Sequence, residues 1–274
     1  MEDFKPPFKP GNYVLYSNMS TGDILQMLST DFTDASETVS FTIPEGYTLI
    51  QIAAKLESEN IVASEDFLAA AENKTYDFDF LQDLPQNTTY QLEGYLFPGT
   101  YTVRKNTTSE EIIFKMLSRF EAITSSYSTY ISHSNYNLHE LLTIASLIEG
   151  ETTLDDERPI ISGVIYNRLT TDMPLQMCTT IEYALEKHKT KLSLDNLKVD
   201  SPYNTYLNVG LPPGPICCPS EASLKAALLP VTHDYYYFVL ANETSGTHTF
   251  SHTASQHHQA KITYHQSLDK NFYE

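Results

Sequence analysis

The stretch Asn137-Leu138-His139-Glu140-Leu141-Leu142-Thr143-Ile144-Ala145-Ser146-Leu147-Ile148-Glu149 holds the clearest helical pattern of the chain and its most informative residue. Asn137 followed by Glu140 is typical of a helix N-terminus, because the two side chains can cap each other's backbone N–H groups. The apolar stripe of this helix passes through Leu142 and Ala145, and the next position on the same face is Glu149. The sequence therefore predicts a helix with a carboxylate on its core-facing side.

Two interpretations of Glu149 are open at this point. A carboxylate on an apolar face is costly unless it is paired or protonated, and desolvation raises its pKa, as a general acid near neutral pH requires. The alternative is a helix-terminal acid paired with a nearby arginine such as Arg158 or Arg168, and the pattern alone favours this alternative. Glu151 lies about 200° further around the helix, so we expect it to face water.

Downstream of this helix the sequence predicts more helices and then a hairpin. A second helix begins near Pro159, a short one follows at about 179–188, and another lies at about 220–229 after a Pro/Gly-rich loop. The apolar run 235–240 and the segment 247–251 are expected to be paired strands joined by a turn. Because helices and strands are segregated rather than alternating, the predicted fold class is α+β.

Upstream, the first 120 residues contain three similar strand–turn–helix units. They begin near Gly11, Val39 and Gly99. Each predicted helix opens with a capping hydroxyl followed three residues later by Asp, Gln or Glu, which is the signature of a helix start. Small units of this kind suit a binding module better than a catalytic one. The polar segment 73–90 is expected to be a joint between two regions.

The composition excludes several classes of function. The chain has 35 acidic and 17 basic residues, a net charge of −18, which argues against binding nucleic acid or anionic lipid through charge. No apolar run approaches the roughly 18 residues that span a bilayer, and the N-terminus has no basic stretch followed by an apolar core. Cys178, Cys217 and Cys218 cannot form a complete disulfide framework and are expected to be packing thiols.

The loop around residues 201–215 could hold sugar. Tyr203, Asn204 and Thr205 precede a rigid Pro/Gly turn. Tyrosine rings stack on sugar C–H surfaces, and Asn and Thr hydrogen-bond hydroxyl and N-acetyl groups. The alternative is an ordered surface loop without a ligand.

Metal and serine-hydrolase chemistry have little support in the sequence. His248, His257 and His258 fit no structural zinc spacing, and no H-E-x-x-H occurs. There is no G-x-S-x-G either. We therefore expect neither a metal ion nor a cofactor, and a metal-dependent hydrolase would have to lose activity to chelators.

Several segments together carry a family resemblance. They are residues 92–101, 145–152, 164–169, 173–176, 201–215, 223–227, 237–239 and 248–250. In this order they resemble the endolytic peptidoglycan transglycosylases of the YceG-like family, which includes membrane-bound lytic transglycosylase G, and they cover most of residues 40–265. The resemblance implies a LysM-like region at 1–85 and a mixed helix/strand catalytic domain at 86–274.

The same resemblance implies a site and a reaction. It places the family's catalytic glutamate on Glu149, the residue that the helix pattern singles out, and this coincidence reverses the preference for a plain salt bridge. The implied reaction is non-hydrolytic cleavage of the β-1,4 bond between N-acetylmuramic acid and N-acetylglucosamine in nascent strands. It leaves a 1,6-anhydro end and terminates elongation. The candidates for positioning sugar are Gln176, Tyr203, Asn204 and Thr205, with Glu93 as a supporting acid.

The resemblance also implies partners and a location. The substrate would be peptidoglycan glycan strands, and the partners would be cell-wall synthases at the membrane. This region would face the extracytoplasmic side of the cell membrane, held by a single N-terminal span that we expect to lie outside this chain.

The chain departs from the family pattern at three places. Residues 177–180 read Met-Cys-Thr-Thr where Asp-Pro-Thr is usual after Leu-Gln, Cys217 and Cys218 replace small residues, and Gly150 stands where Lys is common. The first change puts any role of an acid at 178 in doubt. It leaves a catalytically degenerate peptidoglycan-binding protein as the alternative function.

Overall fold

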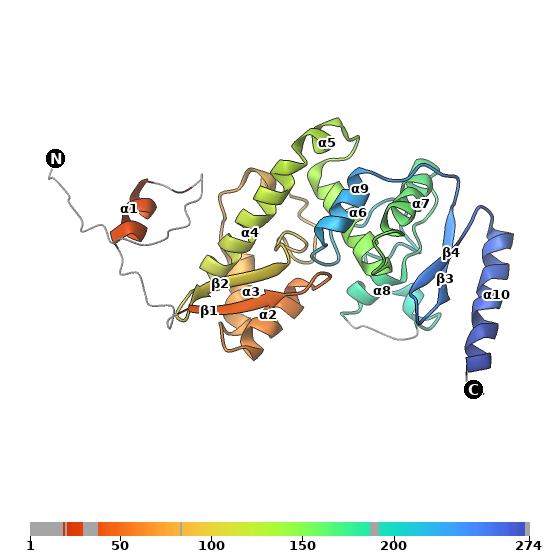
Figure 1. Ribbon diagram of the computed structural model, residues 1–274, viewed down its shortest axis with the longest axis horizontal. Coiled ribbons are helices and arrows are strands. Elements are labelled where there is room, and N and C mark those ends of the chain that lie inside the picture. Colours follow the sequence, from red (N-terminus) through yellow and green to blue (C-terminus); the bar gives the residue numbers. More distant parts are fainter. Residues whose placement is uncertain (1–18, 20, 30–37, 83, 187–191, 272–274) are drawn as a thin grey trace.

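The computed structural model describes residues 19, 21–29, 38–82, 84–186 and 192–271. In these residues two small antiparallel sheets are combined with helices around two buried clusters, so the predicted α+β class is confirmed (Figure 1). The elements in chain order are α1 (Thr21–Ser29), β1 (Thr38–Ile43), α2 (Leu49–Ser58), α3 (Ser64–Asn73), η2 (Asp79–Leu81), β2 (Gly99–Arg104), α4 (Ser109–Ser126), α5 (Ser128–His133), α6 (Leu138–Glu151), α7 (Arg158–Thr170), α8 (Cys178–Ala184), η3 (Asn196–Lys198), α9 (Glu221–Leu228), β3 (Tyr237–Asn242), β4 (Thr247–Ser251) and α10 (Ala254–Asn271).

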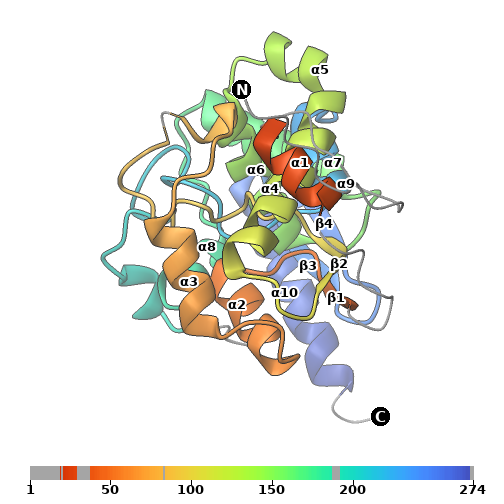
Figure 2. The ribbon, with the colours of Figure 1, turned by 90° about the vertical axis from the view of Figure 1, so that its left-hand side faces the viewer.

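The first half of the molecule packs helices against the β1–β2 pair. The strands are antiparallel with Phe41 opposite Tyr101, and these two rings stack with their centroids 5.7 Å apart. Helices α2 and α3 lie side by side and α3 contacts α4 (Figure 2). The capping boxes predicted at Thr48 and Thr108 are both present. Two of the three predicted strand–turn–helix units are thus confirmed; the strand of the first lies outside the described residues.

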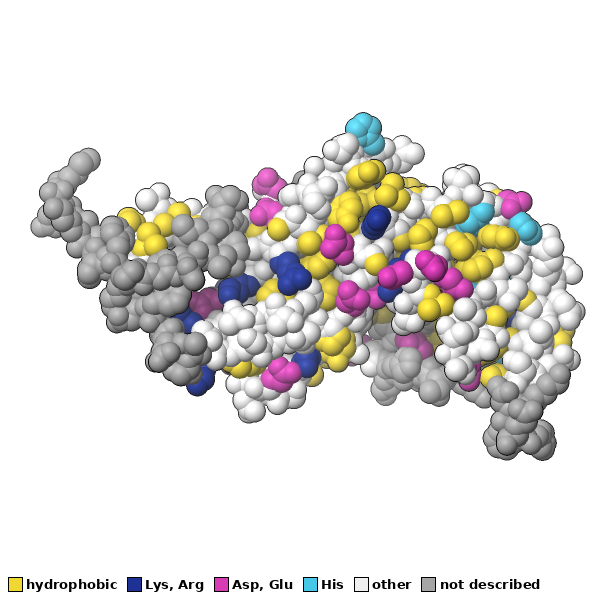
Figure 3. Space-filling model, in the orientation of Figure 1, with side chains coloured by type: hydrophobic (Ala, Val, Ile, Leu, Met, Phe, Trp, Pro, Cys, Tyr) yellow, Lys and Arg dark blue, Asp and Glu magenta, His cyan; other side chains and the backbone are white. Residues whose placement is uncertain are grey.

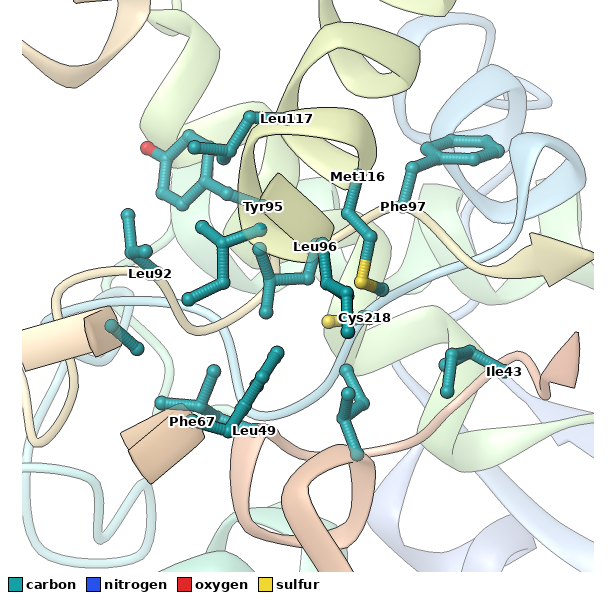
Figure 4. Close-up of a cluster of buried hydrophobic side chains, with 14 of the residues drawn as sticks. Ile43, Leu49, Phe67, Leu92, Tyr95, Leu96, Phe97, Met116, Leu117 and Cys218 are labelled. Atoms are coloured by element: carbon teal, nitrogen blue, oxygen red, sulfur yellow. The ribbon is translucent and has the colours of Figure 1, made fainter. Parts of the chain in front are cut away.

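The domain boundary expected at 85/86 falls inside this first half. Strand β1 lies before that boundary and pairs with β2 after it, and one buried cluster includes Ile43 from the N-terminal side and Met116 from the other (Figure 4). The physical reason is that β1, α2 and α3 need β2 and α4 to cover their apolar faces. The division into 1–85 and 86–274 therefore cuts a shared core, and a LysM-like character of the first region stays a prediction.

The second half is built around α6. This helix contacts α7, α8 and α9, and its N-terminus has the capping box predicted from Asn137 and Glu140. The predicted hairpin is present as β3 and β4, with Phe238 opposite Phe250. Helix α10 packs against this hairpin at the outer edge of the molecule (Figure 1).

Cys217 and Cys218 lie where the first half, formed by β1, β2 and helices α2 to α4, packs against the second half around α6. Cys218 is buried in the first cluster, near Leu96 and Met116 (Figure 4), whereas Cys217 is buried in the second. The Gly46 N–H donates to the Cys218 carbonyl at 2.9 Å, and the Cys218 N–H donates to the Tyr47 carbonyl at 2.8 Å. Both buried thiols are free, which confirms the expected packing role at these two positions.

The surface agrees with the acidic composition. On the face in Figure 3, Asp and Glu side chains gather over the middle of the molecule, and Lys and Arg lie mostly over the first half. In the described part of the chain, no helix has the length and apolar character needed to cross a bilayer.

Candidate active site

A cavity of about 350 Å³ lies where the two halves meet. The turn before α2, the segment before β2, the end of α6, helix α8 and the junction at 216–217 all contribute to its walls. Its lining residues are Gly46, Thr48, Ile50, Gln51, Thr89, Tyr90, Glu93, Glu149, Gly150, Thr179, Glu182, Tyr183, Glu186, Ile216 and Cys217. The cavity therefore contains two of the carboxyl groups that the sequence analysis named, Glu149 and Glu93.

Glu149 lies in the last turn of α6, on the face that the helix pattern predicted. Its side chain is only 8% exposed. The oxygen Oε2 accepts hydrogen bonds from the Ser220 N–H at 3.0 Å, the Ser220 hydroxyl at 2.5 Å and the Ser223 hydroxyl at 2.7 Å. Ser220 is also the N-cap of α9, so the carboxylate meets the positive end of a helix. Within the described residues no hydrogen bond reaches Oε1.

Arg158 completes the surroundings of Glu149. Its Nη1 lies 3.4 Å from Glu149 Oε2 and also donates to the Thr152 carbonyl and the Ser223 hydroxyl, each at 2.9 Å. Arg168 instead donates to the carbonyls of Leu175 and Tyr236. The salt bridge to Arg158 and the place in the cavity therefore occur together, and the two interpretations of Glu149 are compatible.

Glu151 is partly buried, whereas the helix pattern predicted that it would face water. Its Oε1 accepts a hydrogen bond from the Thr179 hydroxyl at 2.8 Å, and burial raises the pKa of this carboxyl. The prediction was wrong because α8 packs against the end of α6 and covers the side that a lone helix would expose.

Glu93 is a fully buried carboxyl in the wall of the same cavity, 1% exposed. The Leu49 N–H at the start of α2 points at both of its oxygens, 3.0 Å from Oε1 and 3.3 Å from Oε2. The Tyr183 hydroxyl lies 3.3 Å from Oε2. Burial raises the pKa of Glu93 to about 8, although these hydrogen bonds oppose the shift. Glu93 therefore links the start of α2 to α8 at the wall of the cavity.

Known proteins resemble this chain over most of its length. The pattern of the YceG-like family matches residues 2–263. The chain belongs to the YceG-like family. It is 38% identical over 272 residues to a protein of Streptococcus pneumoniae serotype 2 (strain D39) named endolytic murein transglycosylase, covering 91% of this chain and 49% of that protein. A Bacillus subtilis (strain 168) protein of the same name is 36% identical over 267 residues, covering 94% and 73% of the two chains.

A solved structure is also similar. The crystal structure of a yceG-like protein from Listeria monocytogenes superposes with a TM-score of 0.73 at 36% identity, covering 92% of this chain and 85% of that one. This YceG-like chain spans about half the length of the Streptococcus pneumoniae relative.

Three predicted sugar-binding residues of this YceG-like chain lie in the interior rather than on the cavity wall. Tyr203 and Thr205 are 2% and 1% exposed, and Asn204 is completely buried. Asn204 Nδ2 donates to the carbonyls of Leu197 and Val199, and its Oδ1 accepts from the Tyr206 N–H. The Thr205 hydroxyl accepts from the Met177 N–H at 3.0 Å. These side chains hold the loop together because its backbone groups have few partners of their own.

Gln176 is exposed and lies outside the cavity lining. Its backbone is in the left-handed region with φ 49°, and its N–H donates to the Thr205 carbonyl at 3.0 Å. The side chain is therefore available to a ligand that extends beyond the cavity.

Two alanine substitutions distinguish a residue that stabilises the loop from one that is exposed on the surface: Asn204→Ala for the first and Gln176→Ala for the second. We expect Asn204→Ala to lower the free energy of unfolding by about 2 kcal/mol, because it leaves two carbonyls and one N–H without partners. Gln176→Ala should change it by no more than about 0.5 kcal/mol. Urea unfolding of both variants measures this, and equal stability of Asn204→Ala and the unsubstituted protein would contradict the scaffold role.

The pKa of Glu93 gives a second prediction, for stability against pH. The folded protein keeps the Glu93 proton up to a pKa of about 8, whereas the ordinary value is 4.5. Between these values the folded state binds more protons than the unfolded state, so stability falls as the pH rises through this window and levels off above it. Thermal unfolding from about pH 5 to about pH 9 should show this decline, and Glu93→Gln should remove it. Parallel curves for the two proteins would contradict the prediction.

Sequence reasoning missed the contribution of α8. Thr179, Glu182, Tyr183 and, just after the helix, Glu186 all line the cavity. Their spacing of three, four and seven residues from Thr179 puts them on one helical face, and this polar stripe was the signal available in the sequence. It was not informative alone, since exposed helix faces have the same pattern.

The histidines of the second half have other partners. The backbone N–H of His248 donates to Glu157, and its ring Nδ1 lies 2.6 Å from the same carboxylate. The ring of His257 stacks on Tyr237. Among the described residues no group of three His, Cys, Asp or Glu side chains could hold a metal ion. The histidines therefore contribute to the packing of the β3–β4 hairpin.

Proposed function

We propose that this chain is the catalytic part of an endolytic peptidoglycan transglycosylase in which Glu149 is the single acid/base. The observation that carries the proposal is the asymmetric environment of this carboxylate. Oε2 is held by Ser220, Ser223 and Arg158, and no hydrogen bond within the described residues reaches Oε1, in a residue that lines the cavity. A fixed carboxyl with one free oxygen can exchange a proton with a bound substrate.

The reaction needs one proton to leave Oε1 and another to return. Glu149 donates its proton to the glycosidic oxygen while the bond from that oxygen to C1 of the muramyl residue breaks. Positive charge develops at C1 as the N-acetylglucosamine hydroxyl departs. The C6 hydroxyl of the same muramyl residue then closes onto C1, and Glu149 takes its proton. The product is a 1,6-anhydro ring, and no water is consumed.

A single carboxyl suffices because the nucleophile belongs to the substrate. Hydrolytic glycosidases use two carboxyl groups, one of which attacks the sugar or activates water. An intramolecular hydroxyl already has a high effective concentration. Glu93, the other buried acid of the cavity named above, is bound to the start of α2, which suits a supporting role rather than that of a nucleophile.

The degenerate-enzyme alternative started from the altered residues at 177–180. Cys178 is exposed, its Sγ lies 3.2 Å from the Tyr206 hydroxyl, and it does not line the cavity. The missing acid therefore lies away from Glu149, and this supports an active enzyme. Binding to peptidoglycan without cleavage remains the outcome that would favour the alternative.

The wider setting is part of the proposal. Peptidoglycan lies outside the cell membrane, so we propose that this region works on the extracytoplasmic face, tethered by a membrane span and near the cell-wall synthases. The LysM-like character of the N-terminal region belongs here as well, as an additional contact to glycan, and exposed Gln176 could meet the same strand.

Product analysis tests the proposed function. Purified protein incubated with intact glycan strands should release fragments with 1,6-anhydro ends, which differ from hydrolysis products by the mass of one water. Ordinary reducing ends would indicate a muramidase instead. Binding without any new ends would favour the degenerate wall-binding protein.

A further inference from the structure

Tyr183 lines the cavity but takes no part in the proton transfer proposed for Glu149. It lies on α8, its ring packs against Tyr203 with centroids 4.8 Å apart, and its hydroxyl lies 3.3 Å from Glu93 Oε2. The Tyr183 hydroxyl and the Glu93 carboxyl thus form a pair in the wall of the cavity that contains Glu149.

The hydrogen of this pair can be arranged in two ways. If Glu93 is ionised, it can only accept, so the Tyr183 hydroxyl must point its hydrogen at Glu93. If Glu93 is protonated, Oε2 can donate to the tyrosine oxygen, while Oε1 accepts from the Leu49 N–H at 3.0 Å. The hydroxyl hydrogen of Tyr183 then no longer points at Glu93 and can turn to an acceptor in the cavity, beside the neighbouring Thr89 and Tyr203 side chains.

We propose that Tyr183 is a substrate-positioning residue that donates a hydrogen bond to a sugar or N-acetyl oxygen in the cavity, and that the buried, protonated Glu93 orients it. This inference rests on the proposed function and adds a specific contact to it. A hydroxyl hydrogen suits the hydroxyl and N-acetyl oxygens of the glycan that the proposed function puts in this cavity.

The surroundings of Glu93 favour the protonated form at neutral pH. Glu93 is buried, and its pKa is raised to about 8. The titratable groups around Glu93 are all acids, contributed by its own segment before β2, by α6, by α8 and by the chain between α8 and α9. They are Tyr90, Glu149, Glu182, Tyr183, Glu186, Tyr203, Cys217 and Cys218. Burial raises the pKa of the neighbouring tyrosines and thiols as well. No described residue adds a cation to the causes of the Glu93 shift.

This arrangement predicts a pH-dependent contact. Near neutral pH Glu93 keeps its proton and Tyr183 donates into the cavity. As the pH rises through about 8, Glu93 ionises. The Tyr183 hydroxyl then donates its hydrogen bond to the Glu93 carboxylate instead of to the substrate. The substrate then loses a hydrogen bond, which corresponds to about a tenfold fall in kcat/KM.

The test is the pH profile of strand cleavage, followed by the release of 1,6-anhydro ends from about pH 6 to about pH 9.5. Tyr183→Phe should lower kcat/KM about tenfold at neutral pH, mostly through KM, and lose the alkaline decline. Glu93→Ala should lose activity more severely, and Glu93→Gln should recover most of that loss, because its amide can donate to Tyr183 and accept from Leu49. Glu93→Gln should also lack the alkaline decline.

Tyr264→Phe is the matched control. It removes an exposed hydrogen bond of 2.9 Å from Tyr264, on α10, to Glu243, so the pH profile should stay that of the unsubstituted protein. If the unsubstituted protein forms no 1,6-anhydro ends, the proposed function fails. If it forms them and both Tyr183→Phe and Glu93→Gln keep its activity and its alkaline decline, only the Tyr183–Glu93 proposal is overturned.

Discussion

Replacement of Glu149 by Gln is expected to abolish the formation of 1,6-anhydro ends, with a loss of at least about 10³-fold in rate. The amide cannot donate a proton to the glycosidic oxygen or take one from the C6 hydroxyl. Folding should persist, because the amide oxygen can still accept from Ser220 and Ser223 in the position of Oε2. The measurement is the rate of strand cleavage by mass spectrometry, with the circular dichroism spectrum as a check of the fold.

Glu151→Gln is the matched control for this experiment. It makes the same change two residues further along α6, where the carboxyl accepts from Thr179 and does not line the cavity. We expect this variant to cleave strands within about threefold of the original rate, as is usual when a hydrogen-bond acceptor is kept. Substantial activity in Glu149→Gln would show that a different group acts as the acid.

Gly94→Ala is expected to cause the largest loss of stability, about 3 kcal/mol. Gly94 has φ 85°, a region that costs other residues about 1–3 kcal/mol. A Cβ there would lie 2.5 Å from the Pro215 Cβ and 3.3 Å from the Cys217 carbonyl oxygen. Either the loop at Pro215 or the segment that contains Glu93 and Gly94 must shift, and this shift adds an overpacking cost of about 1–3 kcal/mol. Thermal unfolding should show a Tm lower by about 6–12 °C.

Gly210→Ala separates the two costs. Gly210 has nearly the same φ, 89°, and a Cβ added to it meets nothing within 4 Å. This variant should lose only about 1 kcal/mol, from backbone strain alone. If Gly94→Ala and Gly210→Ala had the same Tm, the close packing of the Glu93 segment against Pro215 would be refuted.

Local signals were read correctly where one segment contains all the interacting groups. The helix starts at Thr48, Thr108 and Asn137 depend on side chains three residues apart, so they were visible in the sequence. The phase of α6 likewise put Glu149 on the buried face, because a helical period fixes which residues share a side.

Features that depend on distant segments were missed or misjudged. Strand β1 pairs with β2 more than fifty residues later, across the boundary predicted at 85/86. Glu151 was expected in water but lies against α8. Asn204 has a residue type suited to sugar, yet its amide holds the carbonyls of its own loop. Composition and spacing do not contain the packing that decides such cases.

The sequence by itself determined the α+β class, the helix that carries Glu149 and the family, because each follows from local periodicity, capping or the order of motifs. Only the tertiary structure decided what surrounds Glu149. The first turn of α9 supplies hydroxyl and N–H donors to one of its oxygens, and α8 adds Tyr183 to its cavity. These groups are tens of residues apart in the chain, and the packing of α8 and α9 against α6, driven by burial of apolar surface, brings them to one site.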